Sequence, residues 1–122
     1  EVTAGLSGWP PVWCRVVSYD QPTETVTLVR PDGTGRRRIT ADGSEPATMD
    51  VALLDRFEVL AASLGGSGST TVETLTLADL RTGRLVRIAV VTSRAARDGW
   101  LWWAAGDESD QRWYLLDLTT LP

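Results

Sequence analysis

The chain has 122 residues, of which 43% are hydrophobic, and its formal net charge is −4; these values exclude a disordered chain and disfavour nucleic acid as a partner. It has no histidine and no lysine, which excludes Ser-His-Asp and Cys-His catalysis, Schiff-base chemistry and a phosphate-loop lysine within this chain. One cysteine without histidine cannot build a tetrahedral zinc site, so we expect no metal and no cofactor. All twelve cationic side chains are arginines and asparagine is absent, a usage that suggests a GC-rich bacterial genome.

The first part of the chain contains strand signals. Residues 1–8 have no basic segment followed by an apolar core, so we predict no signal peptide there. Residues 12–17 are an apolar run and a predicted strand, in which Cys14 is a small core residue and Arg15 points to the opposite face. Residues 36–38, three consecutive arginines, are the one basic cluster, and we interpret them as a solvated strand edge.

Farther along the chain, short apolar runs alternate with turn residues. Residues 49–64 have the best helical composition, but their apolar runs also fit strands. Asp-Gly dipeptides, at Asp32, Asp42 and Asp98, predict turns because glycine accepts positive φ. Residues 64–70, rich in glycine and serine, are predicted to be a flexible loop within a unit or a short linker. No apolar run approaches the roughly 18 residues of a membrane span, so none is expected.

Internal repeats are the most informative feature of the sequence. Residues 26–40 align without gaps with residues 75–89, and both consist of a strand, a turn and a strand that ends in Arg-Ile and a small residue. Residues 113–120 match the start of the second segment and share its Asp-Leu-x-Thr pattern. Upstream, residues 55–63 match residues 98–106, including two successive alanines. Each unit is thus strand, loop, strand, turn, strand, and units recur every 38 to 49 residues, the size of one β-propeller blade.

One segment resembles a known family. The run from Pro31 to Thr40, Pro-Asp-Gly-Thr-Gly-Arg-Arg-Arg-Ile-Thr, is similar to the blades of TolB-like, six-bladed β-propellers, in which an apolar strand and an Asp-Gly-x-Gly-type turn precede Arg-x-Leu/Ile-Thr. Residues 75–89 fit this pattern more loosely, and the family's Ser-Pro-Asp-Gly start is reduced to Asp98-Gly99. The resemblance implies an all-β propeller fold, a protein or peptide partner, and a place in the cell envelope or elsewhere outside the cytoplasm.

The predicted architecture is one all-β domain over residues 1–122, with antiparallel blade units at 9–46, 47–92 and 93–122. These are about 2.7 repeats, whereas propellers have about four to eight blades. Two explanations stay open: the chain is part of a longer propeller, or it self-associates so that two chains complete a six-bladed ring. Residues 1–8 could supply the missing outer strand of a last blade.

The cluster Trp100, Trp102 and Trp103 is the candidate ligand-binding site. In a strand, the first two share one face and the third takes the other. We interpret the cluster as packing between neighbouring blades, and the alternative is an aromatic platform for a peptide or a sugar. The same two interpretations apply to Trp9 and Trp13.

The acidic residues point to turns rather than to chemistry. Residues 106–110 lack the regular spacing of calcium loops, so we predict a charged hairpin loop there. Asp79 and Asp117 occupy equivalent repeat positions and are predicted to end strands. The pair Asp107 and Asp110 has the chemistry of a general acid and base, but nothing places a substrate between them. We therefore predict no catalytic residue and no enzyme activity.

The function predicted from the sequence is a non-catalytic β-propeller scaffold that binds a protein or peptide. One alternative is a non-catalytic propeller module of a larger hydrolase or peptidase. Another is a propeller that binds a glycan or small molecule through the tryptophan cluster. This prediction of function rests on the predicted fold and not on any single residue, and one fold is compatible with many functions.

Overall fold

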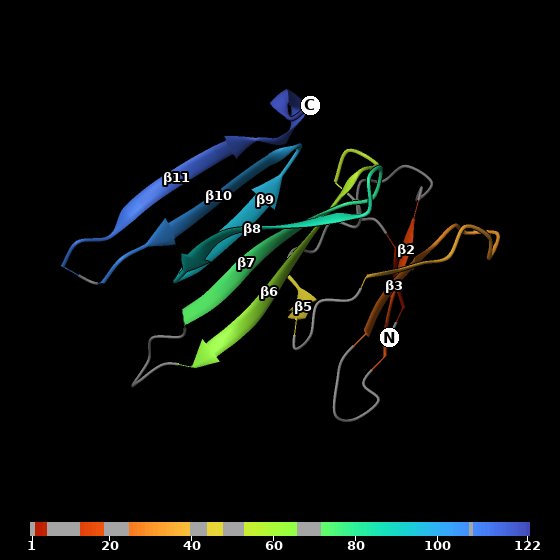
Figure 1. The fold of residues 1–122 in the computed structure, drawn as a ribbon, viewed down its shortest axis with the longest axis horizontal. Coiled ribbons are helices and arrows are strands. Elements are labelled where there is room, and N and C mark those ends of the chain that lie inside the picture. The colour runs from red at the N-terminus through yellow and green to blue at the C-terminus, as the bar shows by residue number, and fades with distance from the viewer. Residues whose placement is uncertain are drawn as a thin grey trace.

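The computed structural model describes residues 2–4, 13–18, 25–39, 44–47, 53–65, 72–107 and 109–122. Within these ranges the chain is all-β, as predicted, and its strands form antiparallel sheets that we call the first, second and third sheet. Figure 1 shows them side by side, with the third sheet at the left, the second in the middle and the first at the right.

Every sheet is a meander, because strands that are neighbours in space are also neighbours in sequence. The first sheet contains β1 (Val2–Ala4), β2 (Cys14–Ser18), β3 (Thr25–Val29) and β4 (Arg37–Ile39). The second contains β5 (Ser44–Pro46), β6 (Phe57–Gly65), β7 (Val72–Asp79) and β8 (Arg84–Val91). The third contains β9 (Ser93–Arg97), β10 (Trp100–Ala105) and β11 (Arg112–Asp117), and a 3-10 turn, η1 (Leu118–Thr120), follows it.

The segments that repeat in the sequence occupy matching places in successive sheets. The first repeated segment forms the β3–β4 hairpin and the second the β7–β8 hairpin, the last two strands of their sheets. The registers agree where Thr27 pairs with Arg38 and the equivalent Thr76 pairs with Arg87, and a register shift before Thr76 makes Leu75 pair with Ala89. The third copy, from Trp113, forms β11, which is again the third strand of its sheet.

The units differ from the prediction in one respect, because a further strand precedes the expected ones. The strands β1, β5 and β9 open the three sheets, which therefore run over residues 2–39, 44–91 and 93–117. Both β1 and β5 have only three residues, and β9 is Ser-Arg-Ala-Ala-Arg, so none has an apolar run that would predict a strand. They form because the next strand offers a free edge for pairing.

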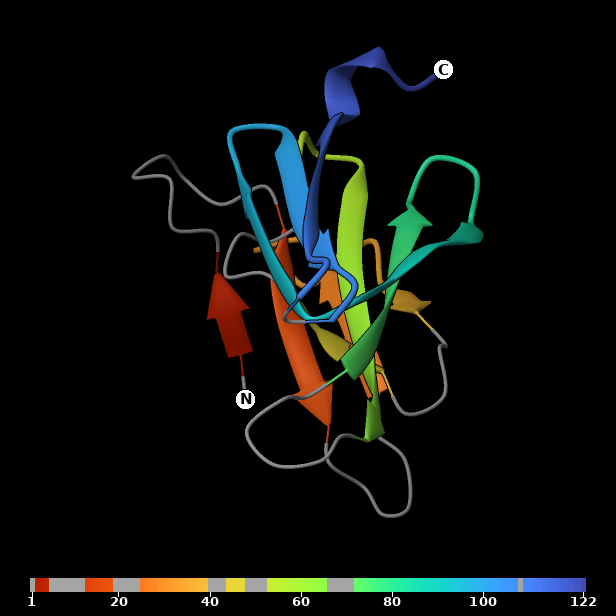
Figure 2. The same ribbon diagram turned by 90° about the vertical axis from the view of Figure 1, so that its left-hand side faces the viewer.

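The sheets stack face to face through two apolar clusters, and Figure 2 looks along this stack. On β6, Leu60 belongs to the cluster shared with the first sheet, and the adjacent Val59 belongs to the cluster shared with the third. Successive side chains of a strand point to opposite faces, so the second sheet is packed on both sides. One cluster includes Trp13, Leu28 and Leu60, and the other includes Phe57, Leu75, Leu101 and Leu118.

The structure tests three predictions about the first half of the chain. Cys14 is half-buried, which corrects the predicted core position, because the neighbouring Arg15 and Trp13 take the face that packs on the second sheet. Strand β1 pairs with β2 in the first sheet, so within this chain it does not complete a last blade. The described part of 49–64 is extended, with β6 as its main element. Trp9 and the Asp42-Gly43 turn lie outside the described residues.

Candidate functional site

The tryptophan-rich strand β10 is the central strand of the third sheet. It pairs with β9 on one side and with β11 on the other. A two-residue turn joins it to β9, in which Asp98 has φ 52° and Gly99 has φ 84°. Positive φ at both positions matches the right-handed twist of a hairpin, and Asp-Gly is a preferred pair for such a turn. This local chemistry sets the register of the strand that carries the candidate residues.

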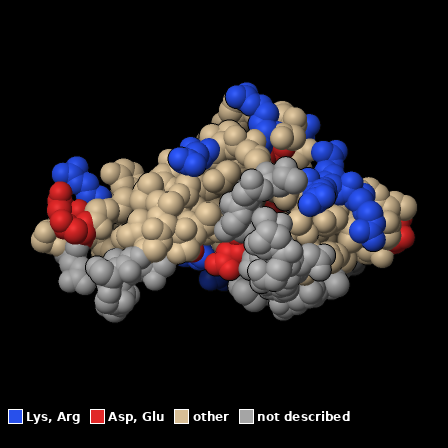
Figure 3. Space-filling view, turned by 60° about the horizontal axis from the view of Figure 1, so that its bottom comes forward, with Lys and Arg blue, Asp and Glu red and all other residues tan. Residues whose placement is uncertain are grey.

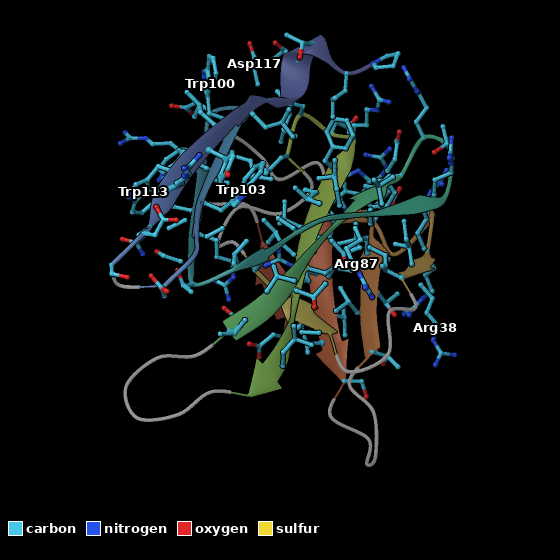
Figure 4. All side chains as sticks on the ribbon, turned by 60° about the vertical axis from the view of Figure 1, so that its left-hand side comes forward. Arg38, Arg87, Trp100, Trp103, Trp113 and Asp117 are labelled. Carbon is cyan, nitrogen blue, oxygen red and sulfur yellow. The ribbon has the colours of Figure 1, made fainter. Side chains whose placement is uncertain are left out.

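The face of the third sheet that points away from the second sheet is strongly apolar. Trp100 and Trp102 alternate on this face of β10, and the cross-strand pairs Trp102–Leu115 and Ala104–Trp113 add two side chains of β11. Trp100, Trp113 and Leu115 are 41%, 59% and 65% exposed. In Figure 4, Trp100 and Trp113 lie on the outer side of the sheet. We call the surface of Trp100, Trp102, Trp113 and Leu115 the outer face.

Trp103 takes the opposite face, as the alternation predicts. It packs against the cluster shared by the second and third sheets and is stacked on Tyr114, with ring centroids 5.8 Å apart and an interplanar angle of 16°. The three tryptophans named from the sequence therefore do not converge on one site. Two lie on the outer face, and the third supports the sheet from behind.

Sequence reasoning missed two members of the outer face, Trp113 and Leu115. The signal was present in the repeat, because an offset of 38 residues places Trp113 over Leu75 and Leu115 over Leu77. Leu75 and Leu77 are 0% and 6% exposed in the second sheet. The alignment thus marks an apolar face on β11 as well as on β10.

The interface between the first and second sheets holds a buried ion pair that sequence reasoning also missed. Arg15 on β2 donates from Nε to Glu58 Oε2 at 2.6 Å and from Nη2 to Oε1 at 2.8 Å. The two side chains are 3% and 0% exposed. This bidentate geometry offsets part of the cost of removing both charges from water. The pair is structural, since it lies inside the stack.

Aspartates close the turns. Asp107 accepts hydrogen bonds from the backbone N–H and hydroxyl of Ser109 and from the backbone N–H of Asp110, and these bonds lower its pKa. Asp32 accepts the same pair of bonds from Thr34, which lower its pKa. The carboxylates are thus held in turns, and among the described residues no group of three His, Cys, Asp or Glu side chains is placed to hold a metal ion.

Asp79 and Asp117 end β7 and β11, the equivalent strands of two sheets, as predicted. Asp117 accepts hydrogen bonds from the backbone N–H and hydroxyl of Thr119 and so caps η1. Asp79 is held by both ends of a guanidinium, with Arg56 Nη2 at 2.7 Å and Nε at 3.1 Å. The hydrogen bond from Arg56 is the main reason that the pKa of Asp79 falls from 3.8 to about 2.

Among the described residues, no helix is long and apolar enough to cross a membrane. Comparisons of the chain with family models, with curated proteins and with solved structures found no match. The outer face of the third sheet is the candidate functional site.

Proposed function

We propose that the chain is a non-catalytic module of β-propeller type that binds another protein through the outer face of its third sheet. Three meander sheets stacked face to face support this proposal, because successive propeller blades have the same arrangement. The resemblance of residues 31–40 to TolB-like blades is consistent with it.

The observation that carries the proposal is a difference in exposure at equivalent positions. Leu75 and Leu77 of β7 are 0% and 6% exposed, because the third sheet covers them. Trp113 and Leu115 occupy the same register positions of β11 and are 59% and 65% exposed. An exposed patch of this kind marks an interaction site. The repeat also indicates what covers it, namely the face of another sheet.

When the chain is alone, a second copy supplies that sheet. We expect the mass in sedimentation velocity to rise from 13.3 kDa as the concentration increases from roughly 5 to roughly 200 μM, since micromolar association is the range of modest interfaces. Leu115→Ser should abolish the rise. Leu64→Ser is the matched control, because Leu64 is 60% exposed on the second sheet, and it should leave the rise intact.

A folded wild-type monomer at every concentration, with all exposed tryptophans accessible to acrylamide, would rule the proposal out. Equal loss of association in both leucine variants would also contradict it, since association would then follow general stickiness and not the outer face. Circular dichroism of the variants separates loss of association from loss of folding.

A second candidate function rests on Trp100 and Trp113, whose exposed rings share the outer face. Aromatic rings of this kind also stack on sugars. Tryptophan fluorescence with a panel of oligosaccharides tests this function, and a shift that disappears in Trp113→Ser would favour it. No shift with any oligosaccharide would leave the protein-binding function as the better account.

A further inference from the structure

A cleft of about 250 Å³ lies between β4 of the first sheet and the β7–β8 hairpin of the second. Three arginines, Arg37, Arg38 and Arg84, belong to its lining, together with Asp79, Gly83 and aliphatic residues. The aliphatic residues are Ile39, Ala78, Leu80 and Leu85. The lining of the cleft is thus both basic and apolar.

The arginines of the chain divide into two sets of six. Six form ion pairs with carboxylates: Arg15, Arg30, Arg56, Arg94, Arg97 and Arg112. The other six are exposed and pair with no carboxylate of the described residues: Arg36, Arg37, Arg38, Arg81, Arg84 and Arg87. All members of the second set lie on or just before β4 or in the β7–β8 hairpin, and three of them, Arg37, Arg38 and Arg84, line the cleft.

This gathering of unpaired charge is notable in an acidic chain. There are sixteen carboxylate residues for twelve arginines, yet the arginines around the cleft have none of them as a partner in the described structure. In Figure 3, blue side chains gather at the right-hand end of the molecule, where the β3–β4 hairpin lies in Figure 1. In Figure 4, Arg38 lies at the right-hand margin of the molecule, and Arg87, its equivalent in the repeat, lies nearer the middle. Like charges held together favour an anionic ligand.

The cleft cannot neutralise itself. Asp79 is the acidic residue of its lining, and both of its oxygens are already held by Arg56. Arg37 is oriented at the wall, because its Nη1 donates to the backbone carbonyl of Leu80. A guanidinium fixed in this way still has donors left for a carboxylate, which it binds in a forked geometry.

The strands beside the cleft, β4 and β8, are edge strands of their sheets. Among the described strands, β4 pairs only with β3, and β8 pairs only with β7. Each therefore presents backbone N–H and C=O groups along one side, to which an extended peptide can add. On β4, Arg37 and Ile39 lie on the face toward the second sheet and Arg38 lies on the opposite face, so successive side chains of such a peptide would meet these two faces in turn.

We infer that this cleft binds an extended acidic peptide, with aspartate or glutamate side chains against Arg37 and the exposed arginines beside it, and aliphatic side chains against Ile39 and Leu85. The apolar lining distinguishes this ligand from nucleic acid, whose phosphates would meet the arginines but leave Ile39 and Leu85 without a partner. The negative charge of the whole chain also opposes a long polyanion.

The test uses fluorescence anisotropy with a labelled peptide of repeating Glu-Glu-Leu-Leu, about ten residues long, which places glutamate and leucine on each face of a strand. We expect saturable binding to the intact chain that weakens severalfold between about 50 and about 300 mM salt, because exposed charges are screened. The same peptide with glutamine in place of glutamate should not bind. A single-stranded oligonucleotide of similar length and charge should bind more weakly than the acidic peptide.

The decisive variant is Arg37→Gln with Arg84→Gln, which should weaken peptide binding by about tenfold or more, since two charge-assisted contacts are removed. Arg97→Gln with Arg112→Gln is the matched control. It removes the same two charges from side chains that are 82% and 73% exposed in the third sheet, and it should leave binding within about twofold.

Three results would overturn the inference. They are no binding of the acidic peptide at about 1 mM, equal loss in the two double variants, and tighter binding of the oligonucleotide. Equal loss would mean that net charge alone attracts the peptide. Leu115→Ser should not change peptide binding, so failure at the cleft and failure at the outer face are separate outcomes.

Discussion

The second and third sheets contain the same repeat unit in different surroundings. Phe57 and Trp100 occupy equivalent positions at the start of β6 and β10, and they are 2% and 41% exposed. Leu77 and Leu115, equivalent in β7 and β11, are 6% and 65% exposed. The unit thus carries an apolar face in both sheets, whereas a neighbour covers that face only in the second. Apolar character at such positions belongs to the repeat, and its exposure marks where a further sheet would pack.

The largest expected effect lies on the other face of the same two sheets. Glu58 and Leu101 occupy equivalent positions and are both 0% exposed, but Glu58 meets Arg15 and Leu101 meets an apolar cluster. Glu58→Gln should lower the free energy of unfolding by about 3–5 kcal/mol, because it removes the negative charge that compensates the buried guanidinium of Arg15. Urea unfolding measures this loss.

The control for Glu58→Gln is Glu73→Gln. Glu73 pairs with Arg94 at 3.3 Å, but both side chains reach solvent, so the loss should be about 0–1 kcal/mol. Replacing both partners of the buried pair, as Arg15→Met with Glu58→Leu, should recover most of the stability. A loss below about 1 kcal/mol for Glu58→Gln would show that the pair is hydrated and does not fasten the first sheet to the second.

The next comparison uses one substitution at two equivalent leucines. Leu77→Ala should cost about 2–5 kcal/mol, since it opens a cavity between the second and third sheets. Leu115→Ala should change the stability of the monomer by no more than about 0.5 kcal/mol, because Leu115 is already in water. Both are measured by urea unfolding at a concentration below that of self-association. Similar losses at the two positions would mean that the outer face is covered within the chain.

A sequence prediction succeeded where the residues that specify an element lie close together in the chain, and it failed where they lie far apart. The β3–β4 and β7–β8 hairpins and the Asp98-Gly99 turn were predictable because short-range patterns specify them. The strands β1 and β5 were not, since they have three residues each and depend on the edge that a neighbour offers. These elements show that local pattern predicted the hairpins but not the strands that complete each sheet.

The sequence predicted only part of the candidate site, for the same reason. Alternation along β10 separated Trp103 from Trp100, but the other members of the outer face come from β11 through cross-strand pairing. The pair Arg15–Glu58 spans 43 residues and exists only once two sheets are stacked. Contacts between sheets therefore carry the information that a single strand cannot show.

A smaller difference separates the two aspartates that close equivalent strands. Asp79→Asn should cost about 1–2 kcal/mol, because it removes a bidentate, charge-assisted contact with Arg56. Asp117→Asn keeps an acceptor for the backbone N–H of Thr119, so it should cost only a few tenths of a kcal/mol. Thermal unfolding at neutral pH compares the two variants. A larger loss for Asp117→Asn would show that the turn at η1, and not the Arg56 contact, is the more important closure.

The smallest effect is a pH dependence at Asp79. Arg56 holds the pKa of this carboxyl at about 2 in the folded chain, whereas the value in the unfolded chain is the ordinary 3.8. The stabilisation is therefore complete above about pH 4–5 and is lost as the pH falls through about 2. The stability difference between the wild type and Asp79→Asn should be constant from about pH 7 to pH 5 and should shrink between about pH 4 and pH 2, as measured by urea unfolding at each pH. A difference that stays constant down to about pH 2 would mean that Arg56 stabilises this position without the charge of Asp79, and the two strand-closing aspartates would then differ only in geometry.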